Sequence, residues 1–231
     1  MRSAVLYRIL RACISLLSIV LIRRHFVGRE NFPKPPYILV SNHMSTFDAP
    51  VLLALCPHVV HAIIAIEQRK SLINRLLLEI AGTIWLRRGE TDRGAMRRAF
   101  GVLKQGRVLG IAPEGTRSHD GALQRGKAGV AYIALRGGVP LIPVGLSGTE
   151  KISQALKRMR RRHVRAAVGK AFQLPPAKHA RGQELQEYAD LIMRHIAALL
   201  PEEYRGFYAD EIGPDSVSTD SLSYLHSDGR R

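Results

Sequence analysis

The sequence is organised around residues 37–48, which read YILVSNHMSTFD. The first four residues are apolar, include β-branched and aromatic side chains, and follow a proline-rich stretch, which predicts a buried strand. The segment that begins at Asp48 has an acid and a proline in its first turn, which predicts a helix. We therefore expect His43 where the strand ends and Asp48 at the N-terminus of the following helix.

That turn allows the carboxylate of Asp48 to reach the imidazole of His43. An aspartate that accepts a hydrogen bond from one ring nitrogen fixes the tautomer and leaves the other nitrogen free to take a proton. Such a pair can activate a substrate hydroxyl without a serine or cysteine nucleophile. Taken alone, the spacing is also typical of a loop histidine beside a helix-capping aspartate, so both interpretations stay open at this point.

Composition narrows the class of protein. A chain of 231 residues is long enough for one domain with a proper core. The net charge is +16, from 35 Lys and Arg against 19 Asp and Glu, which favours anionic partners such as lipid surfaces, phosphorylated substrates or nucleic acid. Cys13 and Cys56 lie in apolar stretches without metal-ligand spacing, so we expect buried free thiols and a reducing compartment.

The N-terminal residues 4–22 are mostly apolar, but two arginines interrupt them. The uncharged part, residues 12–22, would make about 16 Å of helix against a hydrocarbon core of about 30 Å, so we do not expect it to span a membrane. Residues 23–25 are cationic where a secretory signal would have small residues, so no such signal is expected. A helical period places four polar residues on one stripe: Arg8, Arg11, Ser15 and Ser18.

Such a helix suits a membrane interface, with the cationic stripe turned toward the lipid headgroups. The alternative is a helix packed on the protein's own core, with the stripe in water.

Strands and helices alternate along the rest of the chain, which predicts an α/β fold. The expected strands are 58–66, 83–86, 108–112, 139–146 and 164–172, and the expected helices are 70–81, 91–105, 126–135 and 181–200. Lys127 is expected in the first turn of the helix at 126–135. From residue 212 the composition turns to Ser, Asp and Gly, which is typical of a disordered tail.

The predicted strand at 108–112 leads into residues 113–118, PEGTRS. A glycine in a strand-end turn lets backbone N–H groups approach a ligand, and Arg117 can make a two-pronged contact with a phosphate. Glu114 could orient that guanidinium. A plain turn with a surface ion pair would give the same hexapeptide.

Four segments together carry a family resemblance. They are Asn42-His43 with Asp48 five residues after the histidine, GTIWLRR at 82–88, PEGTRS at 113–118 and VPLIPV at 139–144. In this order they resemble the four blocks of the glycerolipid acyltransferases, most closely the 1-acylglycerol-3-phosphate O-acyltransferase branch, over roughly residues 28–150.

The resemblance implies a single α/β acyltransferase domain at 28–205, with a mixed central sheet flanked by helices. It leaves residues 1–27 as an N-terminal, membrane-associated helix and residues 206–231 as a mostly disordered tail. The protein is then expected at the cytoplasmic face of a membrane, in contact with anionic lipids.

The resemblance also implies a reaction. His43 would take the proton of an acceptor hydroxyl, oriented by Asp48, and the oxygen would attack an acyl thioester without a covalent acyl-enzyme. The expected acceptor is 1-acylglycerol-3-phosphate, the product phosphatidic acid, and the donor acyl-coenzyme A or acyl carrier protein. No bound cofactor or metal is expected. The implied substrate-binding residues are Asn42, Arg88, Glu114, Gly115, Thr116, Arg117 and Lys127.

Two other readings stay open: transfer to a different lyso-lipid or an amino-lipid, and a non-catalytic basic protein that binds membranes or nucleic acid. The basic run at 157–165 suits an anionic leaflet, where each cation contributes about 1 kcal/mol, or a solvated loop equally well. No recognition motif accompanies it, so nucleic-acid binding is not expected. A non-catalytic binder has no need of both His43 and Asp48. The sequence leaves the oligomeric state open.

Overall fold

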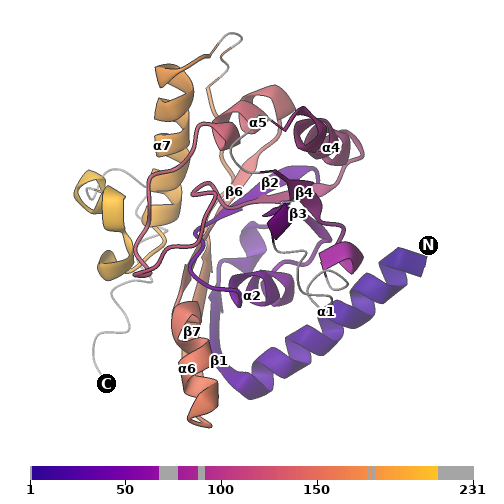
Figure 1. The fold of residues 1–231 in the computed structure, drawn as a ribbon, viewed down its shortest axis with the longest axis vertical. Coiled ribbons are helices and arrows are strands. Elements are labelled where there is room, and N and C mark those ends of the chain that lie inside the picture. Colours follow the sequence, from indigo (N-terminus) through magenta and orange to yellow (C-terminus); the bar gives the residue numbers. More distant parts are fainter. Residues whose placement is uncertain (1, 68–77, 88–91, 176, 178–179, 213–231) are drawn as a thin grey trace.

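A seven-stranded mixed sheet forms the centre of the computed structural model (Figure 1), which describes residues 2–67, 78–87, 92–175, 177 and 180–212. In space the strands follow the order β1-β7-β6-β2-β5-β3-β4. Strands β2 to β6 are parallel, whereas β7 is antiparallel to β6 and parallel to β1. The bounds are β1 Ile22–Val27, β2 Tyr37–Ser41, β3 Val60–Ala65, β4 Ile84–Leu86, β5 Val108–Ile111, β6 Leu141–Ser147 and β7 Arg162–Val168.

Helices cover both faces of this sheet, as predicted. Their bounds are α1 Arg2–Leu21, α2 Asp48–Leu55, α4 Arg93–Lys104, α5 Gly129–Gly137, α6 Ile152–Lys157 and α7 Gln183–Ala197. Strand β2 is buried along its whole length, because it contributes to a core on each side. Ile38 and Val40 pack with α4, α5 and α7, while Tyr37 and Leu39 pack with α2.

The order of the strands explains where a site can form. Strands β5, β2 and β6 are parallel neighbours, so their carboxyl ends meet at one edge of the sheet. The segments that leave these ends are residues 42–48, 112–118 and 148–149. Parallel α/β sheets commonly bind ligands at this edge.

Strand β1 was not predicted, because residues 22–27 were assigned to the N-terminal helical segment. The sequence IRRHFV lacks the alternation of a half-buried strand, and Arg23, Arg24 and His25 are all exposed. The strand forms through backbone pairing with β7, which covers only one of its edges. The sheet therefore begins at Ile22, before the predicted boundary at residue 28.

Three further expectations differ from the structure. Helix α5 begins at Gly129, so Lys127 precedes the helix and does not lie in its first turn. Cys13 is exposed, while Cys56 is buried as expected. The predicted tail began at residue 206, yet Gly206–Glu211 form a 3-10 helix with Tyr208 fully buried.

The hydroxyl of Tyr208 orders this segment, because it donates to Asp190 and accepts from the backbone of Gly126. Residues 213–231, most of the predicted helix at 70–81 and the start of the helix predicted at 91–105 lie outside the described residues.

Helix α1 packs with its polar stripe turned the opposite way from the expectation. The guanidinium of Arg11 donates to the carbonyl of Pro57 at 2.9 Å, and Ser18 is buried beside Arg24. The exposed side chains are mainly apolar: Val5, Leu6, Ile9, Leu16, Leu17, Ile19 and Val20. Arg11 and Ser18 of the stripe therefore contact the domain, Arg8 stays exposed, and the apolar face is left outside. None of the described helices is both long and apolar enough to cross a bilayer.

Candidate active site

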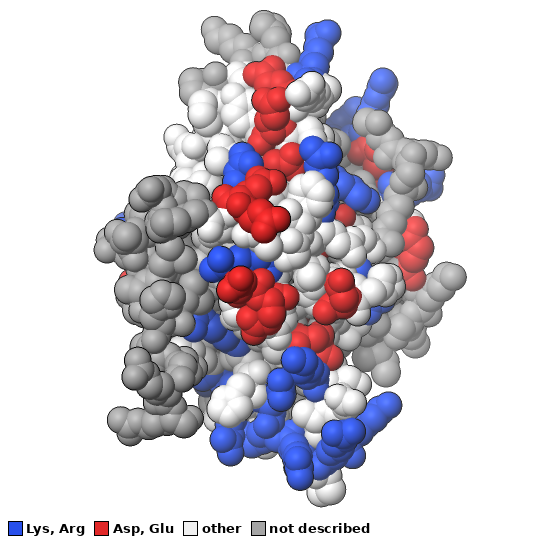
Figure 2. All heavy atoms as spheres, turned by 90° about the vertical axis from the view of Figure 1, so that its left-hand side faces the viewer, with Lys and Arg blue, Asp and Glu red and all other residues white. Residues whose placement is uncertain are grey.

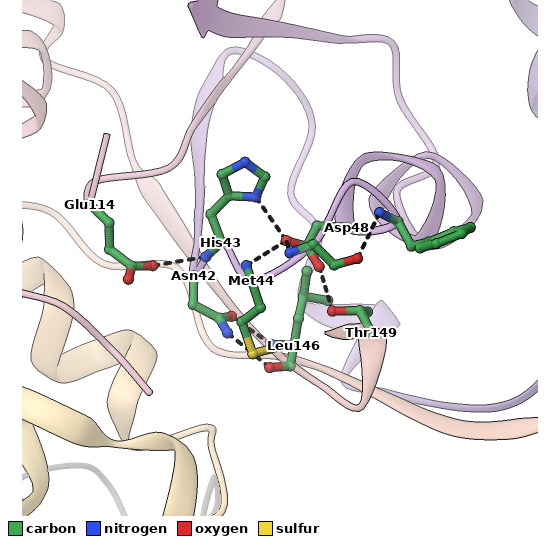
Figure 3. Close-up of polar contacts among 9 residues, drawn as sticks. Asn42, His43, Met44, Asp48, Glu114, Leu146 and Thr149 are labelled. Carbon is green, nitrogen blue, oxygen red and sulfur yellow. Dashed lines mark hydrogen bonds and ion pairs between the residues drawn. The ribbon is translucent and has the colours of Figure 1, made fainter. Parts of the chain in front are cut away.

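The carboxylate of Asp48 organises the turn between β2 and α2 (Figure 3). It is buried, with 2% of the residue exposed. Its Oδ2 accepts from His43 Nδ1 at 2.8 Å and from the backbone N–H groups of Met44 and Ser45 at 2.7 and 2.8 Å. Its Oδ1 accepts from the hydroxyl of Thr149. Four groups therefore hydrogen-bond to one carboxylate, which is the acceptor in each contact.

This contact decides which nitrogen of His43 is available for chemistry. An ionised carboxylate can only accept, so Nδ1 of His43 carries the proton and Nε2 is the basic nitrogen. Figure 3 shows the second ring nitrogen pointing away from Asp48. The side chain of His43 is 32% exposed, whereas that of Asp48 is 3% exposed. A histidine held in this way is able to act as a general base toward a molecule that enters from outside.

The main chain of His43 is held from the other side by the loop that follows β5. Its N–H donates to Glu114 Oε1 at 2.8 Å, and its carbonyl accepts from the N–H of Ser118 at 2.8 Å. The second oxygen of Glu114 accepts from the N–H of Gln124 at 3.0 Å. Burial raises the pKa of Glu114 to about 7, against the opposing effect of its two N–H donors.

Glu114 therefore positions His43 and does not orient Arg117. Both of its oxygens accept from backbone N–H groups, and in the described part of the chain no hydrogen bond or ion pair joins it to the guanidinium.

Asn42 is also engaged inside the protein. Its amide nitrogen donates to the carbonyl of Leu146 at 2.9 Å, and its amide oxygen accepts from the N–H of the same residue at 2.8 Å. This two-bond contact joins the end of β2 to β6. With 2% of the residue exposed, Asn42 fixes the base of the His43 turn.

The exposed cations of the site come from the segment after β5. Gly115 has φ of 67°, and the aliphatic end and Nζ of Lys127 lie 3.1 Å from where a Cβ on Gly115 would be. A side chain at that position would displace the lysine. Arg117 is exposed and, in the described part of the chain, forms no ion pair with an acid, while Thr116 is half-buried. Arg88 lies outside the described residues.

Sequence reasoning missed Thr149, which lies 101 residues after Asp48. The residue is fully buried, and it follows Gly148 directly. Gly148 has φ of 84°, and a Cβ there would lie 2.3 Å from the carbonyl oxygen of His163. A glycine after a buried strand was the available signal for a forced turn, but the partner of the threonine depends on the order of the strands.

No group of three or more His, Cys, Asp or Glu side chains among the described residues is arranged to hold a metal ion.

Comparisons with known proteins agree with this geometry. The sequence profile of the Acyltransferase family matches residues 23–147. A 1-acyl-sn-glycerol-3-phosphate acyltransferase of Chlamydomonas reinhardtii is 28% identical over 198 residues, which cover 82% of this chain and 56% of the relative. The lyso-ornithine lipid O-acyltransferase of Pseudomonas aeruginosa is 36% identical over 116 residues, which cover 50% of this chain and 44% of the relative.

A solved structure is similar as well. The crystal structure of the 1-acyl-sn-glycerophosphate acyltransferase from Thermotoga maritima superposes with a TM-score of 0.63 and 26% identity, covering 80% of this chain and 75% of that one. The chain spans about half the length of the curated relatives it matches.

Proposed function

The chain belongs to the acyltransferase family, and we propose that it transfers a fatty acyl group from an acyl thioester to the free hydroxyl of 1-acylglycerol-3-phosphate, giving phosphatidic acid for phospholipid biosynthesis. The observation that carries this proposal is the contact of 2.8 Å between His43 Nδ1 and the buried Asp48 carboxylate. It leaves a basic nitrogen on the open side of the site, where a substrate hydroxyl can approach it.

The reaction needs one base and one thioester. His43 Nε2 accepts the proton of the acceptor hydroxyl as its oxygen attacks the thioester carbonyl, and Asp48 stabilises the imidazolium that forms. The tetrahedral intermediate then collapses, the carbon–sulfur bond breaks, and the leaving thiolate takes the proton from His43. No acyl group is attached to the protein at any stage. Asn42, Glu114 and Thr149 are positioning residues, because they contact the turn that holds the pair.

Recognition of the acceptor phosphate is assigned to Arg117 and Lys127. Arg117 directly precedes Ser118, whose N–H donates to the carbonyl of His43, so the guanidinium starts from a backbone joined to the catalytic turn. A guanidinium fork can bind two phosphate oxygens, and the Lys127 ammonium beside Gly115 adds a point charge. Arg88 is a third candidate from the family resemblance. Gly115 and Thr116 shape the pocket for the glycerol end of the acceptor.

Either acyl-coenzyme A or acyl carrier protein can supply the thioester, since both present the same carbonyl to the attacking oxygen. The acyl donor is a substrate, so the reaction as written uses no bound cofactor.

We assign the exposed face of α1 to the surface of a lipid bilayer. Seven large apolar side chains lie on it, and the acceptor and the acyl chain are both lipids, so a membrane is the partner that explains an uncovered apolar helix. Cations flank the C-terminal end of the helix: Arg161 donates to the carbonyls of Ile19 and Ile22. Figure 2 shows Lys and Arg gathered at the lower end of the molecule, at the height where Figure 1 places α6.

The pairing of β1 with β7 brings together cations from two stretches far apart in the sequence. Strand β1 carries Arg23 and Arg24, and its neighbour β7 continues the basic run that begins at Lys157. Anionic headgroups would neutralise this charge, with about 1 kcal/mol for each cation near the surface. We therefore propose attachment to one leaflet, on the cytoplasmic side where the acyl donors are made available.

An acceptor panel tests the proposal. Purified protein is given 1-acylglycerol-3-phosphate, lyso-ornithine lipid and lysophosphatidylcholine, each with acyl-coenzyme A and with acyl carrier protein, and the products are identified by mass spectrometry. We expect phosphatidic acid as the main product. The similarity to the lyso-ornithine lipid O-acyltransferase makes lyso-ornithine lipid the second candidate, and a larger turnover with it would replace the proposed acceptor.

The same panel, applied to Arg117→Ala, tests whether Arg117 binds the acceptor phosphate. Loss of a charge-assisted contact of about 1.5–3 kcal/mol should raise KM for the phosphorylated acceptor roughly 10- to 100-fold, with little change for lyso-ornithine lipid. Arg117→Lys should restore only part of this, and Arg97→Ala, an exposed arginine on α4, is the matched control. Equal KM values for the Arg117 and Arg97 variants would remove Arg117 from phosphate recognition.

A further inference from the structure

A cavity of about 310 Å³ lies at the edge of the sheet opposite His43. Its walls are the residues that precede β2, β3 and β5, together with one flank of α1. Since a strand rises about 3.3 Å per residue, the six steps along the chain from Tyr37 to His43 separate the two edges by roughly 20 Å. The cavity is therefore distinct from the acyl-transfer site.

Three of the ten residues that line this cavity are arginines, Arg8, Arg11 and Arg107, and none is Asp or Glu. Arg11 donates to the carbonyl of Pro57, while Arg8 and Arg107 are exposed. Three arginines around one cavity without a lining carboxylate give the cavity a positive potential, which favours the binding of an anion. His58 also lines the cavity, and its pKa is lowered, mainly by burial and to a lesser extent by the positive charge of Arg11.

The floor of the cavity is formed by uncharged groups that are hydrogen-bonded to one another. The hydroxyl of Tyr7 donates to the carbonyl of His58 and accepts from the N–H of Val60, each at 3.3 Å. Nδ1 of His58 lies 3.0 Å from the hydroxyl of Tyr37, inside the core. The mouth is open at Gly106, where no atom lies within 4 Å of the place a Cβ would take. A compact anion can therefore enter without rearranging the floor.

The position of Arg8 indicates where the anion comes from. Val5 and Ile9, on either side of it along α1, are exposed parts of the apolar face that we assign to the bilayer. Arg8 therefore joins the cavity to the flank of that face, and the proposed membrane contact would bring this side of the cavity close to the lipid headgroups. This step depends on the membrane contact stated in the proposed function.

We propose that this cavity binds the phosphate of an anionic lipid headgroup, with a phosphomonoester as the preferred ligand, at a site separate from the acceptor site. A terminal phosphate presents several oxygens and up to two charges, which suits three planar guanidinium forks better than a phosphodiester does. A soluble phosphate ester offers the same chemistry. The lipid is favoured because the mouth adjoins the apolar face.

The first test measures binding to vesicles in the Arg117→Ala background, which weakens the acceptor site. Phosphatidylcholine vesicles carry either phosphatidic acid or phosphatidylglycerol, adjusted to equal surface potential. Two double variants are made in this parent protein. The cavity variant carries Arg8→Gln and Arg107→Gln, and the α4 variant carries Arg93→Gln and Arg97→Gln, which remove the same charge outside the cavity. Arg11 is left in place because it bonds to the domain.

We expect the parent and the α4 variant to bind phosphatidic acid vesicles at least tenfold more tightly than phosphatidylglycerol vesicles. The cavity variant should lose this preference. Equal preference in all three proteins would overturn the proposal.

The second test locates the ligand with a soluble probe. Protein with isotope-labelled histidine is titrated with glycerol 3-phosphate, and the ring signals of His58 are followed by NMR, assigned with His58→Gln. A saturable shift of these signals that disappears in the cavity variant supports the site, and its absence overturns it. A shift with no preference among vesicles would assign the cavity to soluble phosphate esters and reject the lipid. Neither readout needs acyl transfer, so failure of the proposed reaction would not be mistaken for failure here.

Discussion

The edge of the sheet around His43 and the helix α1 differ in what they leave uncovered. Around His43, the polar side chains of Asn42, Asp48, Glu114 and Thr149 are buried and bonded to their neighbours in the domain. On α1 part of the polar stripe contacts the domain and the large apolar side chains face outward. The His43 edge therefore needs no further contact to satisfy its buried polar groups, whereas α1 leaves a large apolar surface uncovered.

This difference separates two tasks. A general base must be held within a fraction of an ångström of its working position, and only a fully bonded surrounding provides that. Meeting a lipid requires apolar surface that the domain itself does not cover. Changes at the His43 edge should therefore alter turnover and leave membrane binding unchanged, and changes on the outer face of α1 should do the reverse.

The largest effect is expected for His43→Ala. Removal of the proposed general base should lower kcat at least 10³-fold with both bilayer-embedded and water-soluble short-chain acceptors. Folding and vesicle co-sedimentation should be unchanged, because the ring is partly exposed and its main chain is held by Glu114 and Ser118. Near-normal turnover of the variant in a contaminant-free assay would contradict the mechanism.

Asp48→Asn should cost less, on the order of 10²–10³ in kcat. The N–H groups of Met44 and Ser45 both need an acceptor, so the amide oxygen should take the place of Oδ2 and the amide nitrogen should face Thr149. The tautomer of His43 would then be retained, and only the charge that stabilises the imidazolium would be lost.

The matching structural check on Asp48→Asn is the Nδ1–H signal of His43 by NMR. A changed tautomer with a larger loss of rate would show that the backbone donors do not orient the amide.

The reverse effect is expected for Ile9→Gln, Leu16→Gln and Val20→Gln together, on the exposed face of α1. Loss of three apolar anchors should weaken vesicle co-sedimentation by about 100-fold and lower activity on bilayer-embedded acceptor, with water-soluble acceptor nearly unaffected. Leu16→Gln alone should weaken vesicle co-sedimentation about tenfold. Phe207→Gln serves as its control, because Phe207 is also an exposed apolar residue. If the Leu16 and Phe207 variants behaved alike, the bilayer contact would lie elsewhere, with the 157–165 run as the next surface to test.

The smallest effect concerns Glu114 and appears in stability. Burial raises its pKa from 4.5 to about 7, so the folded protein retains a proton that the unfolded chain releases between these values. This contribution to stability is present below about pH 4.5 and is lost as the pH rises through 7. The difference in free energy of unfolding between wild type and Glu114→Gln should therefore fall by on the order of 2 kcal/mol from pH 5 to pH 8.

Denaturant titrations of both proteins at several pH values measure this difference, and other titrating groups cancel between them. A difference independent of pH would mean that the N–H donors of His43 and Gln124 keep the carboxylate ionised throughout.

The sequence was sufficient to predict the local part of the site. Residues 43 and 48 lie on one strand–turn–helix unit, so their contact follows from spacing and from the helix start at Asp48. The α/β class and most of the elements follow from apolar runs separated by glycines and prolines. Contacts such as Thr149 to Asp48 and Glu114 to the N–H of His43 depend on which strands are neighbours, and spacing carries no information on that order.

The N-terminal region was harder for another physical reason. The amphipathic pattern of α1 shows that two faces exist, but either face of such a helix can contact the domain. Here the backbone carbonyl of Pro57 and the hydroxyl of Tyr7 draw the polar side inward. Strand β1 was missed because cationic side chains on an edge strand follow no apolar alternation, and its pairing with β7 comes from residues about 140 positions away.

The direct passage from α1 into β1 has a consequence for how the protein searches for its substrates. The helix ends at Leu21 and the strand begins at Ile22, so no linker allows the helix to swivel, and Arg161 bonds to both sides of the junction. A chain held on a leaflet through this helix keeps one tilt and one height, and it retains lateral diffusion and rotation about the membrane normal. Under the proposed membrane attachment, its search would be confined to two dimensions, and His43 would meet every lipid at the same level of the headgroup layer.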